Sequence, residues 1–351
     1  MKHDFPDFGL GKLCGLFGKT RAAIYDYQKR LQRDQLEDEL VLQHVNEIRK
    51  TLPRLGTRKL HYKLAPRLQE HKLTIGRDYL FNLLAEHQLL IRRRRRKTVT
   101  TNSRHWMRKH SNIVQHVKVV RPEQVWVSDI TFIRLNNCWG YLSLITDAYS
   151  RRIMGYAFRT DMATEGNLEA LKMAIENRQY PHLPLIHHSD RGSQYCSNAY
   201  VEMLVKNNIT ISMTQTGDPY ENALAERMNG ILKIEFNLYE SVLGFENTCE
   251  KITASIKAYN EERPHSSCDM LVPLQAHKCS GELKKRWKKY PSKTHQQNSK
   301  KEVVPALSKE QGNPSSFTGN KNVLSSKTRS PVLQEIKSTA AKLENDLLTT
   351  V

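Results

Sequence analysis

The sequence of 351 residues has few cysteines and no long hydrophobic run. Its six cysteines lie far apart, without the paired spacing of metal ligands, which indicates a reducing compartment and excludes a disulfide scaffold or a zinc module. No stretch approaches the roughly 20 apolar residues of a membrane span. The N-terminus, with Asp4, Pro6 and Asp7, lacks the layout of a signal peptide. We therefore expect a cytoplasmic protein without membrane association.

Other chemical signatures are missing as well. The sequence has no Walker-type glycine-rich loop and no Gly-x-Ser-x-Gly elbow, so phosphate-loop and serine-hydrolase chemistry find no support. Acidic residues are fewer than basic ones. The sequence has 55 Lys and Arg and 36 Asp and Glu, which gives a formal net charge of +19. Such a surplus favours a polyanion through counterion release. Nucleic acid is a better explanation than general surface solvation.

The first 110 residues are predicted to be helical and basic. A Gly18-Lys19 break, followed by Thr20 as an N-cap, suggests two short helices in a helix-turn-helix unit. A longer helix over about 35–51 follows, because its apolar residues recur at a spacing of three and four. We expect a DNA-binding region over 1–110, although helical hairpins of this kind are equally common as plain structural units.

A second helical pair is predicted at about 57–68, with Thr57 as N-cap, and at 77–89. A run of six basic residues and then a polar linker follow this helical pair. Because the run lies next to a predicted DNA-binding unit, its side chains are predicted to contact DNA phosphates. They are Arg92, Arg93, Arg94, Arg95, Arg96 and Lys97.

From about residue 123 the hydrophobic pattern changes from helical to strand periodicity. The predicted order is βββαβαβα, a mixed five-stranded sheet flanked by helices in an α/β fold. The strands are expected at 125–135, 141–148, 153–158, 185–189 and 210–213, and the helices at 164–177, 197–207 and around Glu226. A further helix is predicted over 246–259. Residues 291–351, rich in Lys, Ser, Asn and Gln, are expected to be a disordered polar tail.

Two acids stand out within the predicted sheet. Asp129 lies inside the apolar run 125–133, where a carboxylate must ligate a cation or form a salt bridge, and taken alone the two are equally favoured. Asp190 ends the fourth strand, where it could equally form a turn. Thirty-five residues, 191 to 225, separate it from Glu226.

The helix that carries Glu226 is predicted to have two different sides at about 100° per residue. Its polar side holds Asn222, Glu226, Asn229, Lys233 and Asn237, and its apolar side holds Leu224, Met228, Ile231 and Leu232. The polar side is either a solvated surface or a face that meets a polyanion, and its low charge density favours the polyanion.

Oxygen ligands without a His or Cys cluster suit Mg²⁺ or Mn²⁺. Two such ions support an in-line phosphoryl displacement that needs no protein nucleophile. His187 and His188 lie close to Asp190 and are candidate general bases, but histidines in a strand more often serve packing, which we favour.

Several motifs carry a family resemblance. They are Trp126-x-x-Asp129-Ile130-Thr131, Asp147-x-x-Ser150-Arg151, His188-Ser189-Asp190-x-Gly192, Glu221-Asn222-Ala223-x-Ala225-Glu226, and Tyr259-Asn260-x-x-Arg263-Pro264-His265. Together with Lys233, seven residues after Glu226, they resemble the catalytic core of DDE transposases and retroviral-type integrases. The chain is similar to the second-reading-frame transposase of bacterial insertion-sequence family three, over about residues 5–280.

This resemblance implies an RNase H-like catalytic core, over 118–280, in which Asp129, Asp190 and Glu226 are catalytic and ligate two Mg²⁺ ions, with Mn²⁺ as a substitute. It implies cleavage at terminal inverted repeats and strand transfer into target DNA by a homo-oligomer, in the nucleoid of a bacterial cell. Lys233 and Asn222 are expected to contact DNA, and Asp147 to be structural.

Members of this family usually act as a fusion with an upstream-frame product, and the present sequence shows no leucine-zipper heptads. The alternative function is therefore a catalytically idle protein that binds element ends and regulates transposition. A resolvase or RNase H-type nuclease is disfavoured by the basic helical region and by the segment Arg263-Pro264-His265.

Overall fold

The computed structural model describes residues 9–91, 107–215, 221–239 and 243–286. All of them belong to one compact unit, residues 1–290. The predicted cationic run 92–97 and the predicted tail 291–351 lie outside the described residues. Within the described part, no helix has the length and apolar character needed to cross a membrane.

The predicted mixed five-stranded sheet is confirmed. Strands β1 (Val125–Arg134), β2 (Trp139–Asp147) and β3 (Ile153–Arg159) form an antiparallel meander. Strands β4 (Leu185–Ser189) and β5 (Ile209–Met213) continue the sheet in parallel from the other edge of β1, which gives the order β3-β2-β1-β4-β5. The central strand is thus β1, which carries Asp129.

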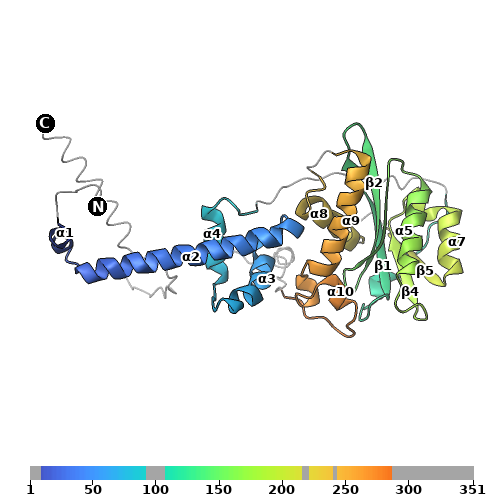
Figure 1. The fold of residues 1–351 in the computed structure, drawn as a ribbon. Helices are drawn as coiled ribbons and strands as arrows, with labels where there is room; N and C mark the ends of the chain where they lie inside the picture. Colours follow the sequence, from blue (N-terminus) through green and yellow to red (C-terminus); the bar gives the residue numbers. More distant parts are fainter. Residues whose placement is uncertain (1–8, 92–106, 216–220, 240–242, 287–351) are drawn as a thin grey trace, which may run out of the picture. The chain divides into compact units, whose positions relative to one another are not determined.

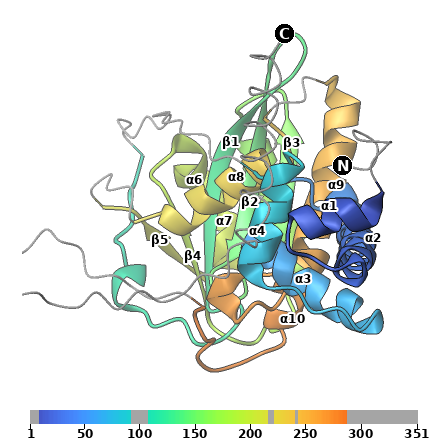
Figure 2. The same cartoon turned by 90° about the vertical axis from the view of Figure 1, so that its left-hand side faces the viewer.

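Helices cover both faces of the sheet (Figure 1, and Figure 2 after a turn of 90°). Helices α5 (Thr164–Glu176), α6 (Ser193–Cys196) and α7 (Asn198–Lys206) pack on one face, around Trp126 and Ile145. Helices α8 (Ala223–Glu235) and α9 (Phe245–Glu262) pack on the other, around Leu142 and Leu144. Alternate residues of β1 therefore face opposite layers, which explains its nearly continuous apolar sequence.

One glycine allows the close packing of α5. A Cβ atom on Gly155 of β3 would lie 2.1 Å from the carbonyl oxygen of Ala170 and 2.9 Å from the Cβ of Ala174. Any side chain at this position would push α5 away from the sheet.

The N-terminal region begins with α1 (Leu10–Leu16) and α2 (Arg21–Thr51). The Thr20 hydroxyl accepts a hydrogen bond from the Ala23 amide at 3.1 Å, which confirms the predicted N-cap. The predicted separation of a short helix from a later helix over 35–51 is wrong, because α2 is one helix of 31 residues. Its sequence contains no glycine or proline, so nothing in the backbone interrupts it.

The second predicted helical pair is confirmed as α3 (Thr57–Glu70) and α4 (Arg77–Glu86). Its boundaries differ from the prediction. Gly56 occupies the N-cap position of α3, and the predicted cap, Thr57, is buried inside the first turn. Helix α4 ends three residues earlier than predicted, and Gln88 follows with a positive φ of 56°.

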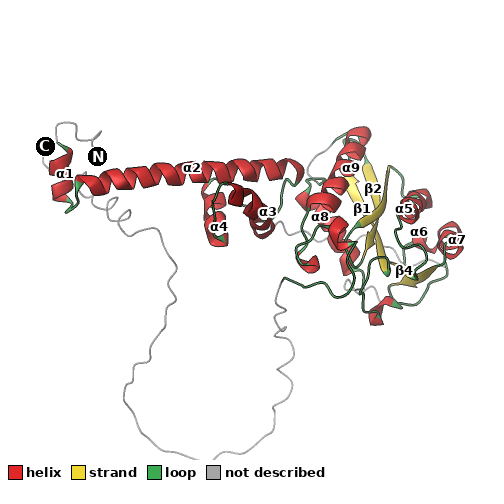
Figure 3. Cartoon of the chain, turned by 60° about the horizontal axis from the view of Figure 1, so that its bottom comes forward, coloured by secondary structure: helices red, strands yellow, loops and turns green. Residues whose placement is uncertain are grey.

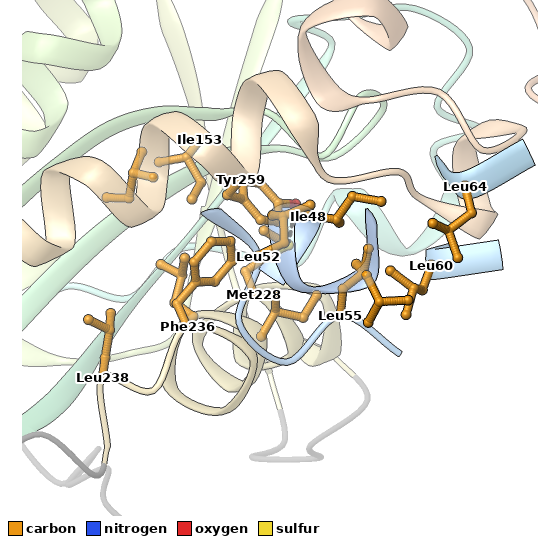
Figure 4. Close-up of a cluster of buried hydrophobic side chains, with 14 of the residues drawn as sticks. Ile48, Leu52, Leu55, Leu60, Leu64, Ile153, Met228, Phe236, Leu238 and Tyr259 are labelled. Atoms are coloured by element: carbon orange, nitrogen blue, oxygen red, sulfur yellow. Dashed lines mark hydrogen bonds between the residues drawn. The ribbon is translucent and has the colours of Figure 1, made fainter. Parts of the chain in front are cut away.

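The N-terminal helices share a hydrophobic cluster with the sheet domain (Figure 4). Ile48, Leu52 and Leu55, at and after the end of α2, pack into the same cluster as Met228 of α8 and Tyr259 of α9. The predicted regions 1–110 and 118–280 are thus in direct contact within the described residues.

A buried polar network lies beside this cluster. Arg263 is almost fully buried and donates two hydrogen bonds to the Glu235 carboxylate, at 2.7 and 2.6 Å. Lys59 of α3 lies 3.8 Å from the same carboxylate. Thr51 of α2 donates to Glu262 at 2.8 Å. These polar and charged side chains bond to one another where α2 and α3 contact α8 and α9. The contact between the N-terminal helices and the sheet domain therefore has directional bonds as well as buried apolar area.

A second polar cluster holds the short helix α10 (Pro273–Ala276) against the sheet. The buried Asp147 carboxylate accepts hydrogen bonds from the amides of Glu123 and Ser150, both at 2.7 Å. His277 lies 3.3 Å from the Glu123 carboxylate and 3.7 Å from that of Asp147. Asp147 is therefore structural, as predicted.

The shared hydrophobic cluster should contribute strongly to stability. We expect Ile48→Ala to lower the free energy of unfolding by about 2–4 kcal/mol, because it leaves a cavity in the cluster. Val205→Ala on α7 is the matched control, since Val205 is 62% exposed, and it should change the free energy by less than about 0.5 kcal/mol. Urea denaturation followed by circular dichroism measures both. Equal losses would contradict the importance of the contact between α2 and the sheet domain.

The His277 cluster predicts a dependence of stability on pH. Burial opposes the charged imidazole, but the carboxylates of Asp147 and Glu123 outweigh it, so the pKa of His277 is raised above its ordinary 6.5. A raised pKa stabilises the fold below the unfolded value, and this contribution is lost as the pH rises through the folded pKa. Thermal stability should therefore fall as the pH rises above the ordinary histidine pKa of 6.5, and it should fall less steeply in His277→Gln. The exposed His182→Gln is the control, and an unchanged slope in His277→Gln would refute the assignment.

Candidate active site

Asp129 lies in β1, and Asp190 directly follows the end of the neighbouring parallel strand β4. Strands β1 and β4 are paired from Val125 to Val127, and the last pair is Val127 with His188. Asp129 and Asp190 each lie two residues beyond that pair. Because strand side chains alternate with a period of two, both carboxylates belong to the same face, and neighbouring strands lie about 4.8 Å apart.

Glu226 reaches this face from α8. It lies in the first turn of the helix, and Ala225 packs with Val125 and Val127 of β1. Immediately before the helix, the Asn222 side-chain amide donates to the Ser128 carbonyl at 3.1 Å. This bond fixes the start of α8 beside Asp129, so β1, the end of β4 and α8 place the three predicted acids on one face of the sheet.

The three carboxylates influence one another electrostatically. Burial, the charge of Asp190 and a smaller effect of Glu226 raise the pKa of Asp129 to about 7. Burial and the charge of Asp190 also raise the pKa of Glu226. A cluster of like charges of this kind is costly without a cation, and perturbed carboxylates in one place mark a candidate catalytic site.

Asn229 is a site residue that the sequence reasoning did not assign. Its side-chain amide donates to the Asp129 carboxylate at 2.7 Å, and the Ile130 amide donates to the other carboxylate oxygen at 3.0 Å. Together these bonds fix the orientation of Asp129. The signal was present, because Asn229 follows Glu226 by three residues on the predicted polar side of the helix.

Two predicted DNA contacts, Lys233 and Asn222, can be located. Lys233 is partly buried on the same side of α8, where burial lowers its pKa and the nearby Asp129 charge opposes that effect. Asn222 is only 6% exposed, and its side chain connects the start of α8 to β1, so it has a structural role in the fold. Contact of either residue with DNA stays a prediction.

His187 and His188 serve packing, as favoured from the sequence. His187 is buried beside the hydroxyls of Ser128 (2.7 Å) and Tyr200 (2.9 Å), and burial lowers its pKa to about 3. His188 lies 2.9 Å from the hydroxyl of Ser212 and 3.1 Å from the carbonyl of Glu221.

The donor set fits a hard divalent cation. It consists of carboxylate and amide oxygens, which Mg²⁺ and Mn²⁺ prefer. Two buried side-chain oxygens, Oδ1 of Asn222 and Oδ1 of Asn229, accept no hydrogen bond within the described residues. In the same part of the chain, no three His, Cys, Asp or Glu side chains close around a common point as metal ligands would. Asp129 is instead held by Asn229, and Asp190 accepts from the Gly192 amide at 3.0 Å.

Comparison with known proteins identifies the family of the chain. Two families described as integrase core domains match residues 119–219 and 207–273. A 31 kDa protein of insertion element IS600 from Shigella sonnei, itself described as uncharacterized, is 34% identical over 269 residues, which cover 74% of this chain and 96% of that protein. Transposase InsF for insertion sequence IS3A of Escherichia coli K12 is 29% identical over 282 residues, covering 78% of this chain and 95% of InsF.

The chain belongs to the IS3 family of transposases. The first integrase-core match of this transposase contains Asp129 and Asp190, and the second contains Glu226. Among solved structures, the catalytic core domain of HTLV-2 integrase in complex with magnesium aligns with a TM-score of 0.37 and 19% identity, over 46% of this chain and 99% of that domain.

If the three acids share a cation, Asp129→Asn should have two opposite effects on the stability of the transposase, one without metal and one with Mg²⁺. Without metal, removing one of three adjacent charges should raise the free energy of unfolding by about 1 kcal/mol. The rise in melting temperature that Mg²⁺ causes in the parent protein should disappear. Thermal unfolding with EDTA and with Mg²⁺ measures both effects, and an unchanged response to Mg²⁺ would place the cation elsewhere.

Proposed function

We propose that this IS3-family transposase cuts one DNA strand at each terminal inverted repeat of its element and joins the freed 3′-hydroxyl to target DNA. The observation that carries the proposal is the approach of Asp129, Asp190 and Glu226 on one face of the sheet, where burial and the charge of Asp190 raise the pKa values of Asp129 and Glu226. Membership of the IS3 family supports the same reaction.

Asp129, Asp190 and Glu226 would hold two Mg²⁺ ions, or Mn²⁺ in their place. When bound, such ions activate the attacking oxygen and stabilise the leaving oxygen of an in-line phosphoryl displacement. Asn229 keeps Asp129 in position through the 2.7 Å hydrogen bond. The helix that presents Glu226 also presents Lys233, whose amine would bind a phosphate near the transferred end.

DNA binding extends beyond the acidic face. We propose that the basic helices of the region 1–110 and the run from Arg92 to Lys97 bind phosphates of the element end, while residues 118–280 hold the catalytic core. Two ends must be joined in one event, so a homo-oligomer on DNA, in the bacterial nucleoid, follows from the reaction. An upstream-frame protein would add to end recognition.

The assay uses the purified protein and labelled duplexes that carry the DNA ends flanking its gene. Nicking at the 3′ end and strand transfer should require Mg²⁺ and cease with EDTA. Glu226→Gln should lower the rate by more than about 100-fold, since loss of supporting residues around a metal already costs about 10–100-fold. Glu202→Gln, an exposed acid on α7, is the matched control and should retain the parental rate.

The same assay addresses the alternative of a catalytically idle regulator that binds element ends. DNA binding with no products from either the parent or the Glu226→Gln protein would favour it. Adding the upstream-frame protein then distinguishes the two functions. Products that appear only with that partner would show that the protein is a transposase that needs the partner, and not an idle regulator.

A further inference from the structure

A loop leads into β1 (Figure 3, loops in green). Its first part, residues 107–119, is called the edge loop and contains one short 3₁₀ helix, Val114–His116. At the start of the edge loop, Met107 packs against the hydrophobic cluster on the face of the sheet that α5, α6 and α7 cover. Farther along, Val117 and Val119 pack against the opposite face, where α8 begins. The edge loop therefore passes from one face of the sheet to the other.

Hydrogen bonds fix the edge loop at the carboxyl end of β5, the edge strand on this side of the sheet. The Met213 amide donates to the Ser111 carbonyl at 3.3 Å. The Ile113 amide donates to the Ser212 hydroxyl at 3.1 Å. Met213 pairs in register with the last residue of β4, which directly precedes Asp190. The edge loop thus crosses the edge of the sheet at the end where the acidic site lies.

Two exposed cations, Arg108 and Lys109, lie between these anchors, and within the described residues no ion pair ties either of them to an acid. Burial and the charge of Asp190 raise the pKa of the buried Cys196 thiol. The positive charges of Lys109 and Arg191 oppose this effect, so both cations lie near the same thiol as Asp190. The β5 side of the acidic site is therefore lined by positive charge.

We propose that Arg108 and Lys109 bind backbone phosphates of the DNA strand that enters the acidic site. The inference rests on the proposed function, because it concerns DNA held at that site. Along one strand of a duplex, a phosphate occurs about every 3.4 Å of helix axis. A strand with one phosphate beside Asp190 therefore carries further phosphates to the neighbouring edge of the sheet, where the two cations lie.

The fixed backbone of the edge loop favours this role. A cation on a free linker must lose backbone freedom when it binds, whereas Arg108 and Lys109 are already held by packing at Met107 and by the hydrogen bond at Ser111. Lys233 approaches the acids from α8, and these two cations approach from the β5 edge. Positive charge is thus supplied from two separate elements around one acidic site, as a strand with several phosphates requires.

The salt dependence of DNA binding tests the proposal. Binding of the full chain to the end duplex, and to a target duplex without end sequence, is measured in EDTA so that no reaction occurs. Each phosphate contact contributes about 0.9 to the slope of log binding constant against log salt concentration. Lys109→Gln should lower this slope by about 0.9 and weaken binding about tenfold near 0.1 M salt, for at least one duplex. Arg108→Gln in the same chain should lower the slope further.

Lys206→Gln is the matched control. It removes an exposed cation at the end of α7, beside the opposite end of β5, and should leave the slope unchanged. Lys109→Arg keeps the charge and should bind like the parent. Equal slopes for the parent and Lys109→Gln on both duplexes would overturn the proposal. Because the measurement needs no turnover, it remains informative even where the strand-transfer assay gives no products, and the two proposals can fail separately.

Disulfide cross-linking tests the position of Lys109 directly. The accessible cysteines are first replaced by serine; they are Cys138, Cys249 and Cys279. In this chain with Glu226→Gln and Mg²⁺, Lys109→Cys should cross-link to a thiol-tethered nucleotide next to the reacting phosphate, and Lys206→Cys should not. A cross-link to the end duplex assigns the phosphates to the element end, and a cross-link to the target duplex assigns them to target DNA. Either result supports the proposal, whereas no cross-link to either duplex contradicts it.

Discussion

The repulsion among Asp129, Asp190 and Glu226 is the constraint around which the sheet domain is built. Three neighbouring carboxylates repel one another and oppose folding. The strands and the helix that carry them must therefore be held together by other interactions. Hydrophobic clusters on both sides of the sheet supply that force, through Trp126 and its neighbours on one face and Leu142 and Leu144 on the other. Stability contributed elsewhere in the domain thus maintains a locally unfavourable arrangement that a cation can relieve.

Helix α8 connects this arrangement to the N-terminal helices. Asn222, just before the helix, is bonded to β1, and Glu226 follows in the first turn. At the other end of the same 13-residue helix, Glu235 binds Arg263 and lies near Lys59 of α3. A buried ion pair adds less to stability than its distances suggest, but it specifies one geometry. A shift of α3 would therefore displace the helix that presents Glu226.

Much of this could be predicted from the sequence, for reasons that the structure makes clear. The five strands were found because their apolar residues alternate or run continuously, and the acids because Asp129 is out of place in such a strand. The continuity of α2 was missed, since Asp34 and Asp38 interrupt the apolar spacing that helix prediction relies on. The role of Asn229 and the pair of Glu235 with Arg263 depend on which elements meet in three dimensions, and local patterns do not contain that information.

The sheet order also sets the sequence of events as the chain folds. The meander β1-β2-β3 is made of neighbouring segments, so it closes short loops and can form early. Pairing of β1 with β4 must wait for the chain to close a loop of some sixty residues between Val127 and His188, and α8 arrives later still. On a ribosome, the strand that holds Asp129 is synthesised before Asp190 and Glu226. The complete acidic site can therefore arise only when the last part of the core has been added.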